Sequence, residues 1–158
     1  MKNIEIKIVK KLDSGFIEEW NALVNASNNA HFFNTPAWFI SCINAFDIYE
    51  YFIFAAYYEN ELMGVLPLVK EKKFAVNVFA SPGKKLLEKT TLIAKDNNPE
   101  ILNKLILEVL KHGNIYLAEV SKDVTATFSI KFGHGLLTLS SINPYIPLRE
   151  PPLGALSN

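Results

Sequence analysis

Two apolar segments, at residues 51–58 and 62–69, flank the short polar sequence Glu59-Asn60-Glu61. The first segment is rich in aromatic residues, and the second has the composition of a buried strand that Gly64 and Pro67 interrupt. Two such segments joined by a tight polar turn predict a β-hairpin. This hairpin constrains the fold more than any other feature, because it makes the centre of the sheet antiparallel.

A strand and two helices are expected before the hairpin. Isoleucines alternate with charged residues at 4–8, which predicts a strand. Asp13 or Ser14 can then cap a helix, and Thr35 can cap a second helix that has Pro36 at its first position. The side chains expected to point inward from this second helix are Trp38, Phe39, Ile43 and Phe46.

The elements expected after the hairpin are a strand at 74–79, a short strand at 90–94, a helix from Asn98-Pro99 to Gly113, a strand at 115–120, a helix at 123–132 and a strand at 136–142. The chain has 158 residues, of which 49% are hydrophobic, as in a single globular domain. We therefore predict an α/β (α+β) fold, in which a mixed, largely antiparallel central sheet is flanked by helices.

The composition argues against several classes of protein. The chain has 16 basic and 16 acidic residues, and its single arginine is Arg149, so nucleic-acid binding is disfavoured. Its single cysteine, Cys42, excludes an internal disulfide. The first residues lack the apolar block of a secretory signal, and the longest apolar run is too short to span a bilayer. We expect a cytoplasmic protein with no membrane span.

The expected order of elements resembles that of the GNAT acetyltransferase fold, and five short sequences sharpen the likeness. They are Trp20 with Leu23, the sequence at 32–38, the strand at 62–69, Phe79-Ala80-Ser81-Pro82, and Tyr145-Ile146-Pro147-Leu148. With these sequences the chain is similar to the first half of the FemAB-like and cellulose-biosynthesis CelD-like acyltransferases. Members of that branch are built from two GNAT-like halves.

The resemblance implies a GNAT-like N-terminal domain at 1–142 and a Pro-rich linker or tail at 143–158 that leads to an absent second half. In this family the acyl donor site belongs mainly to the second half, so acyl-CoA (acetyl-CoA) is expected only for the full-length protein. The implied function is acylation of an amino sugar, a polysaccharide precursor or peptidoglycan, with this half inactive alone. The implied partners are the second half or another protein chain, and a sugar or sugar-nucleotide acceptor.

The start of the helix at Pro99 is unsuited to coenzyme A. A GNAT domain binds the pyrophosphate of the coenzyme with backbone amides of a glycine-rich turn that opens this helix. Here the sequence is Asp96-Asn97-Asn98-Pro99-Glu100, in which proline removes one amide and the acidic residues repel an anion. We expect a helix start satisfied by its own acidic side chains and no cofactor-binding residues in this chain.

Four lysines near the third strand are candidates for binding an acceptor. Lys70, Lys72, Lys84 and Lys85 could offer positive charge to an anionic group such as a sugar nucleotide. Lysines at the ends of strands also block unwanted pairing of sheet edges, which explains them equally well.

Candidates for acid–base chemistry lie at two turns. Tyr57 and Glu59 at the turn of the hairpin could protonate a thiolate and deprotonate an amine, and His134 could act as a general base. Solvent-exposed turn residues are the simpler interpretation. No metal site is expected, because His31, His112 and His134 are too far apart and no second cysteine joins them.

Two other functions stay open. A stand-alone, non-catalytic binding or interaction module with the same fold would be monodisperse and would unfold cooperatively. A severed half would instead expose apolar surface and associate or aggregate. A complete single-domain N-acetyltransferase would need the coenzyme site that the sequence before Pro99 does not provide.

Overall fold

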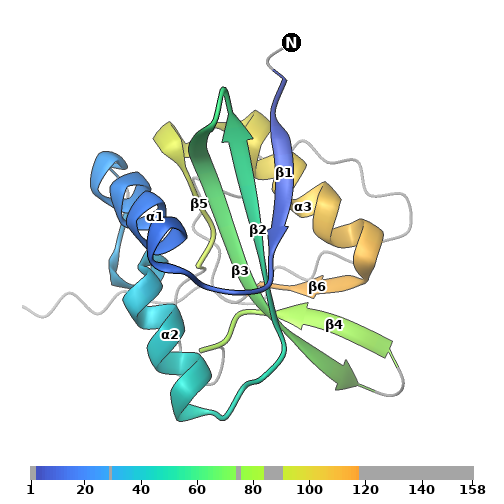
Figure 1. The fold of residues 1–158 in the computed structure, drawn as a ribbon. Coiled ribbons are helices and arrows are strands. Elements are labelled where there is room, and N and C mark those ends of the chain that lie inside the picture. Colours follow the sequence, from blue (N-terminus) through green and yellow to red (C-terminus); the bar gives the residue numbers. More distant parts are fainter. Residues whose placement is uncertain (1–2, 29, 74–75, 84–90, 118–158) are drawn as a thin grey trace, which may run out of the picture.

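The computed structural model describes residues 3–28, 30–73, 76–83 and 91–117. The expected helix at 123–132, the expected strand at 136–142 and the tail at 143–158 lie outside the described residues. The elements in chain order are β1 (Glu5–Val9), α1 (Ser14–Ala26), the 3-10 turn η1 (Phe32–Asn34), α2 (Pro36–Ala45), β2 (Tyr51–Tyr58), β3 (Glu61–Lys73), β4 (Val76–Ala80), β5 (Ile93–Ala94), the 3-10 turn η3 (Lys95–Asn97), α3 (Pro99–His112) and β6 (Asn114–Tyr116) (Figure 1).

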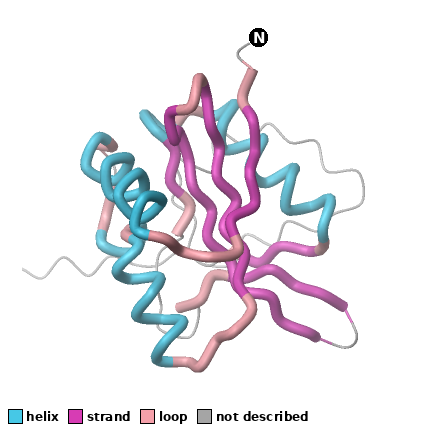
Figure 2. The backbone as a smooth tube through the Cα atoms, in the orientation of Figure 1, coloured by secondary structure: helices cyan, strands magenta, loops and turns pink. Residues whose placement is uncertain are grey.

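These strands form one mixed sheet in the order β1-β2-β3-β4-β6, and β5 pairs with β3 beside β4. All strand pairs are antiparallel except β4 with β6, which are parallel and are joined through α3. Helices α1 and α2 pack on one face of the sheet and α3 packs on the other (Figure 2). The structure confirms the predicted fold class, a largely antiparallel sheet flanked by helices.

The predicted hairpin is confirmed and forms the centre of this sheet. Its register runs from Tyr51 opposite Val69 to Tyr58 opposite Glu61, with a bulge between Ala56 and Tyr57. Glu59 and Asn60 at the turn have φ values of 50° and 66°. Two successive residues with positive φ twist the turn in the same sense as the strands, which is why such turns join hairpins.

Pro67 is tolerated in the middle of β3 because the outer edge of that strand has two separate partners. β5 pairs with Gly64 and Val65, whereas β4 pairs with β3 only from Val69 onward. Pro67 falls between these two pairings, and its carbonyl accepts a hydrogen bond from the side-chain hydroxyl of Thr91 at 3.2 Å. A residue without an N–H therefore costs the ladder no hydrogen bond at this position.

Gly64 lets α3 approach the sheet. A Cβ atom added at Gly64 would lie 2.6 Å from Cγ2 of Ile101 and 3.2 Å from Cδ1 of Leu105. Both of those side chains are buried against the sheet, together with Phe54 and Leu66. The absence of a side chain at Gly64 thus allows α3 to pack tightly against β3 at this position.

The two faces of the sheet carry separate cores because strand residues alternate in direction. In β2, Phe54 points toward α3, and its neighbour Ile53 points toward α1 and α2. Trp20 of α1 is fully buried in the second core, where its ring nitrogen donates to the carbonyl of Asn34 at 2.8 Å. Burial of both faces makes the sheet a stable platform for the segments at its edges.

The caps decide where the first two helices begin. Asp13, not Ser14, caps α1, because its carboxylate accepts a hydrogen bond from the amide of Phe16 at 2.8 Å. Thr35 caps α2 as predicted, since its hydroxyl accepts from the amide of Trp38 at 3.1 Å. The expectation for Phe46 is wrong: this residue ends α2 and is 40% exposed.

We predict that Gly64→Ala destabilises the protein by about 1–3 kcal/mol, because the new methyl group overlaps Ile101 and α3 must move away from the sheet. Gly15→Ala is the matched control. A Cβ at Gly15 meets only the Asp13 carboxylate oxygen, at 3.5 Å, so this change is expected to be neutral or stabilising by less than about 1 kcal/mol. Urea denaturation of the two variants measures the difference, and equal stability would contradict the close contact.

Candidate functional site

The turn of the β2–β3 hairpin and the exposed side of α1 enclose an open cavity of about 470 Å³. Its lining residues come from α1, the hairpin turn and the segment after β5. They are Glu19, Ala22, Leu23, Ala26, Glu59, Asn60, Glu61, Leu62 and Lys95. The cavity therefore joins three parts of the chain that are far apart in sequence.

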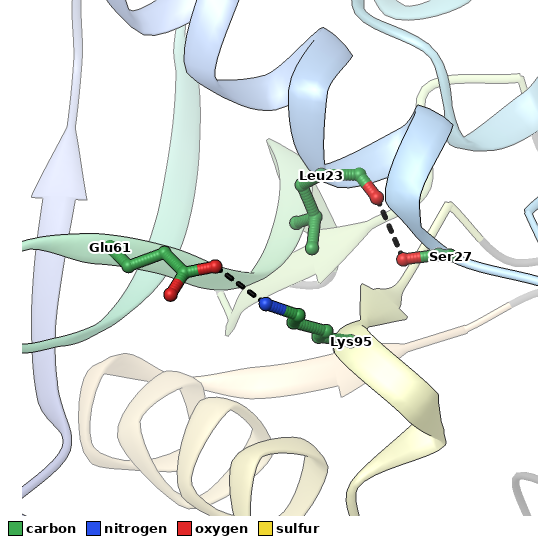
Figure 3. Close-up of polar contacts among 4 residues, drawn as sticks. All are labelled: Leu23, Ser27, Glu61 and Lys95. Atoms are coloured by element: carbon green, nitrogen blue, oxygen red, sulfur yellow. Dashed lines mark hydrogen bonds and ion pairs between the residues drawn. The ribbon is translucent and has the colours of Figure 1, made fainter.

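Two polar contacts lie at this cavity, one between β3 and the segment after β5 and one within the last turn of α1 (Figure 3). The Lys95 ammonium lies 2.6 Å from the Glu61 carboxylate, and the Ser27 hydroxyl donates to the carbonyl of Leu23 at 2.7 Å. The hydrogen bond with Glu61, followed by the charge of Glu61, raises the pKa of Lys95 above its usual value. Lys95 neutralises only one of the three carboxylates that line the cavity, so the local charge favours a cation over an anion.

Tyr57, one of the acid–base candidates, lies beside this cavity and is held by α1. Its hydroxyl donates a hydrogen bond to a carboxylate oxygen of Glu19 at 2.7 Å. Burial, and then the hydrogen bond and charge of Glu19, raise the pKa of Tyr57 well above its usual range. The phenol therefore stays protonated and is a poor proton donor near neutral pH, because its conjugate base is disfavoured.

Glu59, the second candidate, lines the cavity from the hairpin turn. A hydrogen bond to Glu59, followed by the charge of Glu59, raises the pKa of its neighbour Tyr58. The third candidate, His134, lies outside the described residues. The structure thus brings Tyr57 and Glu59 to one end of the hairpin, as the sequence predicts, and adds Glu19 and Lys95 to them.

Of the candidate acceptor-binding lysines, Lys70 has a described side chain, and it does not join this cavity. Lys70 lies at the opposite end of the hairpin, about 26 Å along β3 from Leu62 at the cavity. There it pairs with Glu50 at 3.0 Å and lies 5.9 Å from the centre of the Phe52 ring. The backbone of Lys72 is in β3, but its side chain is outside the described part. Lys84 and Lys85 lie outside the described residues altogether.

The start of α3 is fully capped by one residue. The side-chain oxygen of Asn98 accepts hydrogen bonds from the amides of Glu100 at 2.9 Å and Ile101 at 3.4 Å. The carbonyl of Asn98 accepts from the amide of Leu102 at 3.1 Å, and Pro99 has no N–H. Each amide that a helix start normally offers to an anion is therefore absent or already bonded.

This cap corrects one expectation from the sequence. The acidic side chains near the start of α3 were expected to satisfy its amides, but Asn98 does so. Glu100 instead faces the next turn of the helix, where its carboxylate lies 3.4 Å from the ammonium of Lys104. Asn98 is the better cap because its short side chain reaches the amides from the residue just outside the helix.

Among the described residues, no three histidine, cysteine, aspartate or glutamate side chains are arranged to hold a metal ion. Cys42 is buried in α2. None of the helices in the described ranges combines the length and the apolar character needed to cross a bilayer.

Comparison of the chain with protein-family models, with curated proteins and with solved structures gave no match. Its function is therefore inferred from its own contacts. Those contacts are the capped start of α3, the parallel pair β4 and β6, and the charged cavity at the hairpin turn.

We predict that replacing Asn98 with Ala lowers the free energy of unfolding by about 1 kcal/mol, because the amides of Glu100 and Ile101 lose their acceptor. Asn98→Asp is the matched control, since a carboxylate keeps the acceptor and interacts favourably with the helix dipole. Guanidinium denaturation compares the three proteins. An alanine variant as stable as the original chain would show that the cap contributes nothing.

The pH dependence of stability tests the environment of Tyr57. Above pH of about 10 the tyrosine of an unfolded chain loses its proton, whereas folded Tyr57 keeps it. The folded state then binds more protons, so the stability that this raised pKa provides is complete below pH of about 10 and is lost as the pH rises further. We predict that the fall in unfolding free energy between about pH 9 and pH 11 is shallower in Tyr57→Phe, with Glu19→Gln intermediate. Identical slopes in the three proteins would contradict the contact.

Proposed function

We propose that this chain is the N-terminal, cofactor-free half of a GNAT-superfamily acyltransferase that acts on an amino-sugar, polysaccharide-precursor or peptidoglycan acceptor. The observation that carries the proposal is the combination of a GNAT-like order of elements with a capped α3. Asn98 occupies the amides of Glu100 and Ile101, the groups that would otherwise bind a pyrophosphate.

The arrangement of the sheet supports the GNAT-like part of the proposal. The described part of the chain runs through a strand, two helices, four strands in antiparallel pairs, a helix and a further strand, which matches the order that the resemblance implies up to this point. The last strand of the described residues, β6, returns parallel to β4 after the crossover through α3, with Ala80 opposite Tyr116. Parallel neighbours require such a crossover connection, and here the crossover contains the helix whose start decides whether a coenzyme can bind.

In the proposed reaction the acceptor amine or hydroxyl attacks an acyl thioester or aminoacyl ester held by the second half. The new amide or ester bond forms as the carbonyl–sulfur or carbonyl–oxygen bond of the donor breaks, and the acceptor proton leaves with the thiol or alcohol. This half contributes packing and one wall of the acceptor groove. The cavity beside Glu19 and Glu59 has the charge that suits a protonated amino group.

A stand-alone binding module is the second candidate, and the completeness of the two cores favours it. Trp20 and Phe39 are fully buried on one face of the sheet, and Phe54 and Leu105 are fully buried on the other. A chain that buries both faces can fold without a second half. Catalysis would then have no place in the function of this chain.

Ligand titration separates these candidates. Calorimetry with acetyl-CoA is expected to give no binding heat for the proposed half, since the start of α3 has no free amide. NMR titration with glucosamine is expected to shift amide signals of residues that line the cavity, whereas UDP-N-acetylglucosamine, whose diphosphate the three carboxylates repel, is expected to shift them less. Micromolar binding of acetyl-CoA would overturn the cofactor-free assignment in favour of a complete acetyltransferase. Failure of every ligand to bind would overturn the acceptor role in favour of the stand-alone module.

A further inference from the structure

The first strand of the described chain, β1, borders the sheet. It pairs with β2 along its whole length, from Glu5 opposite Tyr57 to Val9 opposite Ile53, and no other strand of the described residues pairs with it. Figure 1 shows β1 at this border, away from α1 and α2. An edge strand of this kind offers its outward N–H and C=O groups to a further strand.

Two hydrogen bonds of β3 show which backbone groups of β2 face β1. The amide of Lys70 donates to the carbonyl of Glu50, directly before β2, at 3.3 Å. The carbonyl of Pro67 accepts from Thr91 on the other side of β3, where β5 pairs. Residues directly opposite in an antiparallel pair bond to each other through both backbone groups or through neither. Ile53, which lies opposite Pro67, therefore turns its backbone groups away from β3 and toward β1.

The same alternation determines the direction of the groups in β1. Val9 lies opposite Ile53 and Lys7 lies opposite Ala55, two residues further along β2, so both turn their backbone groups to β2. Ile6 and Ile8 alternate with them and turn their N–H and C=O groups outward. Within the described ranges no backbone or side-chain group bonds to these outward groups. The free edge of β1 thus has a defined set of donors and acceptors.

The side chains of β1 differ between its two faces. On the face toward α3, Ile4, Ile6 and Ile8 are partly buried and pack against the core. On the opposite face, the Glu5 and Lys7 side chains are 66% and 48% exposed, and their charged groups lie 3.7 Å apart. The edge strand therefore presents isoleucines on one face and one charge of each sign on the other.

We propose that β1 pairs with β1 of a second copy of this chain, antiparallel about a two-fold axis at Ile6, so that the two sheets become one. In this register Ile6 lies opposite Ile6 of the other copy, and Ile4 lies opposite Ile8. The outward N–H and C=O groups of these isoleucines then bond across the axis. On the exposed face, Glu5 of each copy lies opposite Lys7 of the other. The proposal concerns assembly and does not depend on the acyl-transfer function.

Charge complementarity favours a second copy and selects this register. Charged residues on an edge strand prevent pairing with a strand whose charges do not match. With the axis at Ile6, Glu5 and Lys7 form an opposite-charge pair on each side of the axis, and such pairs stabilise neighbouring strands. An axis at Glu5 or at Lys7 would place that charge opposite its own copy. An axis at Ile8 would leave Glu5 beyond the end of the partner strand.

The dimer is expected to be weak and reversible. β1 has 5 residues, so the contact consists of a few backbone hydrogen bonds and the side chains beside them. Small interfaces are typical of transient complexes, and we expect a dissociation constant of about 0.1 mM. The formal net charge of +0 lets two copies approach without long-range repulsion.

Charge reversal tests the proposal, with sedimentation equilibrium over concentrations that bracket the expected dissociation constant. Glu5→Lys and Lys7→Glu each place like charges opposite each other on both sides of the axis. Each is expected to raise the dissociation constant about tenfold or more. The double variant Glu5→Lys/Lys7→Glu restores opposite charges and is expected to dimerise like the original chain. Glu18→Lys, at an exposed position of α1, changes the net charge as Glu5→Lys does and is the matched control, which should leave dimerisation unchanged.

Amide hydrogen exchange followed by NMR gives a second measurement. The outward amides of Ile6 and Ile8 are expected to exchange rapidly at low concentration and more slowly as the fraction of dimer rises. The amides of Lys7 and Val9 face β2 and are expected to exchange slowly at every concentration. Circular dichroism establishes that each variant folds.

Four results would each overturn the proposal. The first is a monomer throughout the concentration range, and the second is a dimer that neither single charge reversal weakens. The third is a double variant that dimerises no better than the single variants. The fourth is exchange at Ile6 and Ile8 that does not change with concentration.

Discussion

The close contact between β3 and α3 at Gly64 is the constraint on which the rest of the structure depends. Because Gly64 has no Cβ, Ile101 and Leu105 lie directly against the strand and complete the core on that face of the sheet. This contact fixes the path of α3 across the sheet. It places Asn98 near the turn end of the hairpin and returns the chain at Gly113 to form β6 beside β4.

The start of α3 links this packing to function. A helix start is an anion site only when its amides are free, and a single side chain can remove that property. Asn98 does so here by accepting from two amides, while Pro99 removes a third. The same fold could therefore serve catalysis or binding. Whether it can hold a coenzyme depends on whether the amides at the start of this one helix are free or already hydrogen-bonded.

The residues at the cavity beside the hairpin turn were only partly predictable from the sequence. Tyr57 and Glu59 were recognisable from the sequence because both belong to the hairpin turn, a local feature. Glu19 and Lys95 were missed, since each is an ordinary exposed charge on its own element and gains a partner only when α1 and the segment after β5 reach the same turn. Likewise Phe46 has a core-type side chain, yet the end of α2 leaves it exposed.

The sequence by itself determined the type and order of the described elements, because caps, turns and strand alternation act between neighbours: Asp13 or Ser14 and then Thr35 could begin helices, and Glu59 with Asn60 turns a hairpin. It also determined that the sheet is largely antiparallel. Tertiary structure alone decided that β5 and β4 share the edge of β3 around Pro67, and that Glu61 meets Lys95. Such contacts join residues far apart in the chain, and their formation depends on how whole elements pack, which no local pattern encodes.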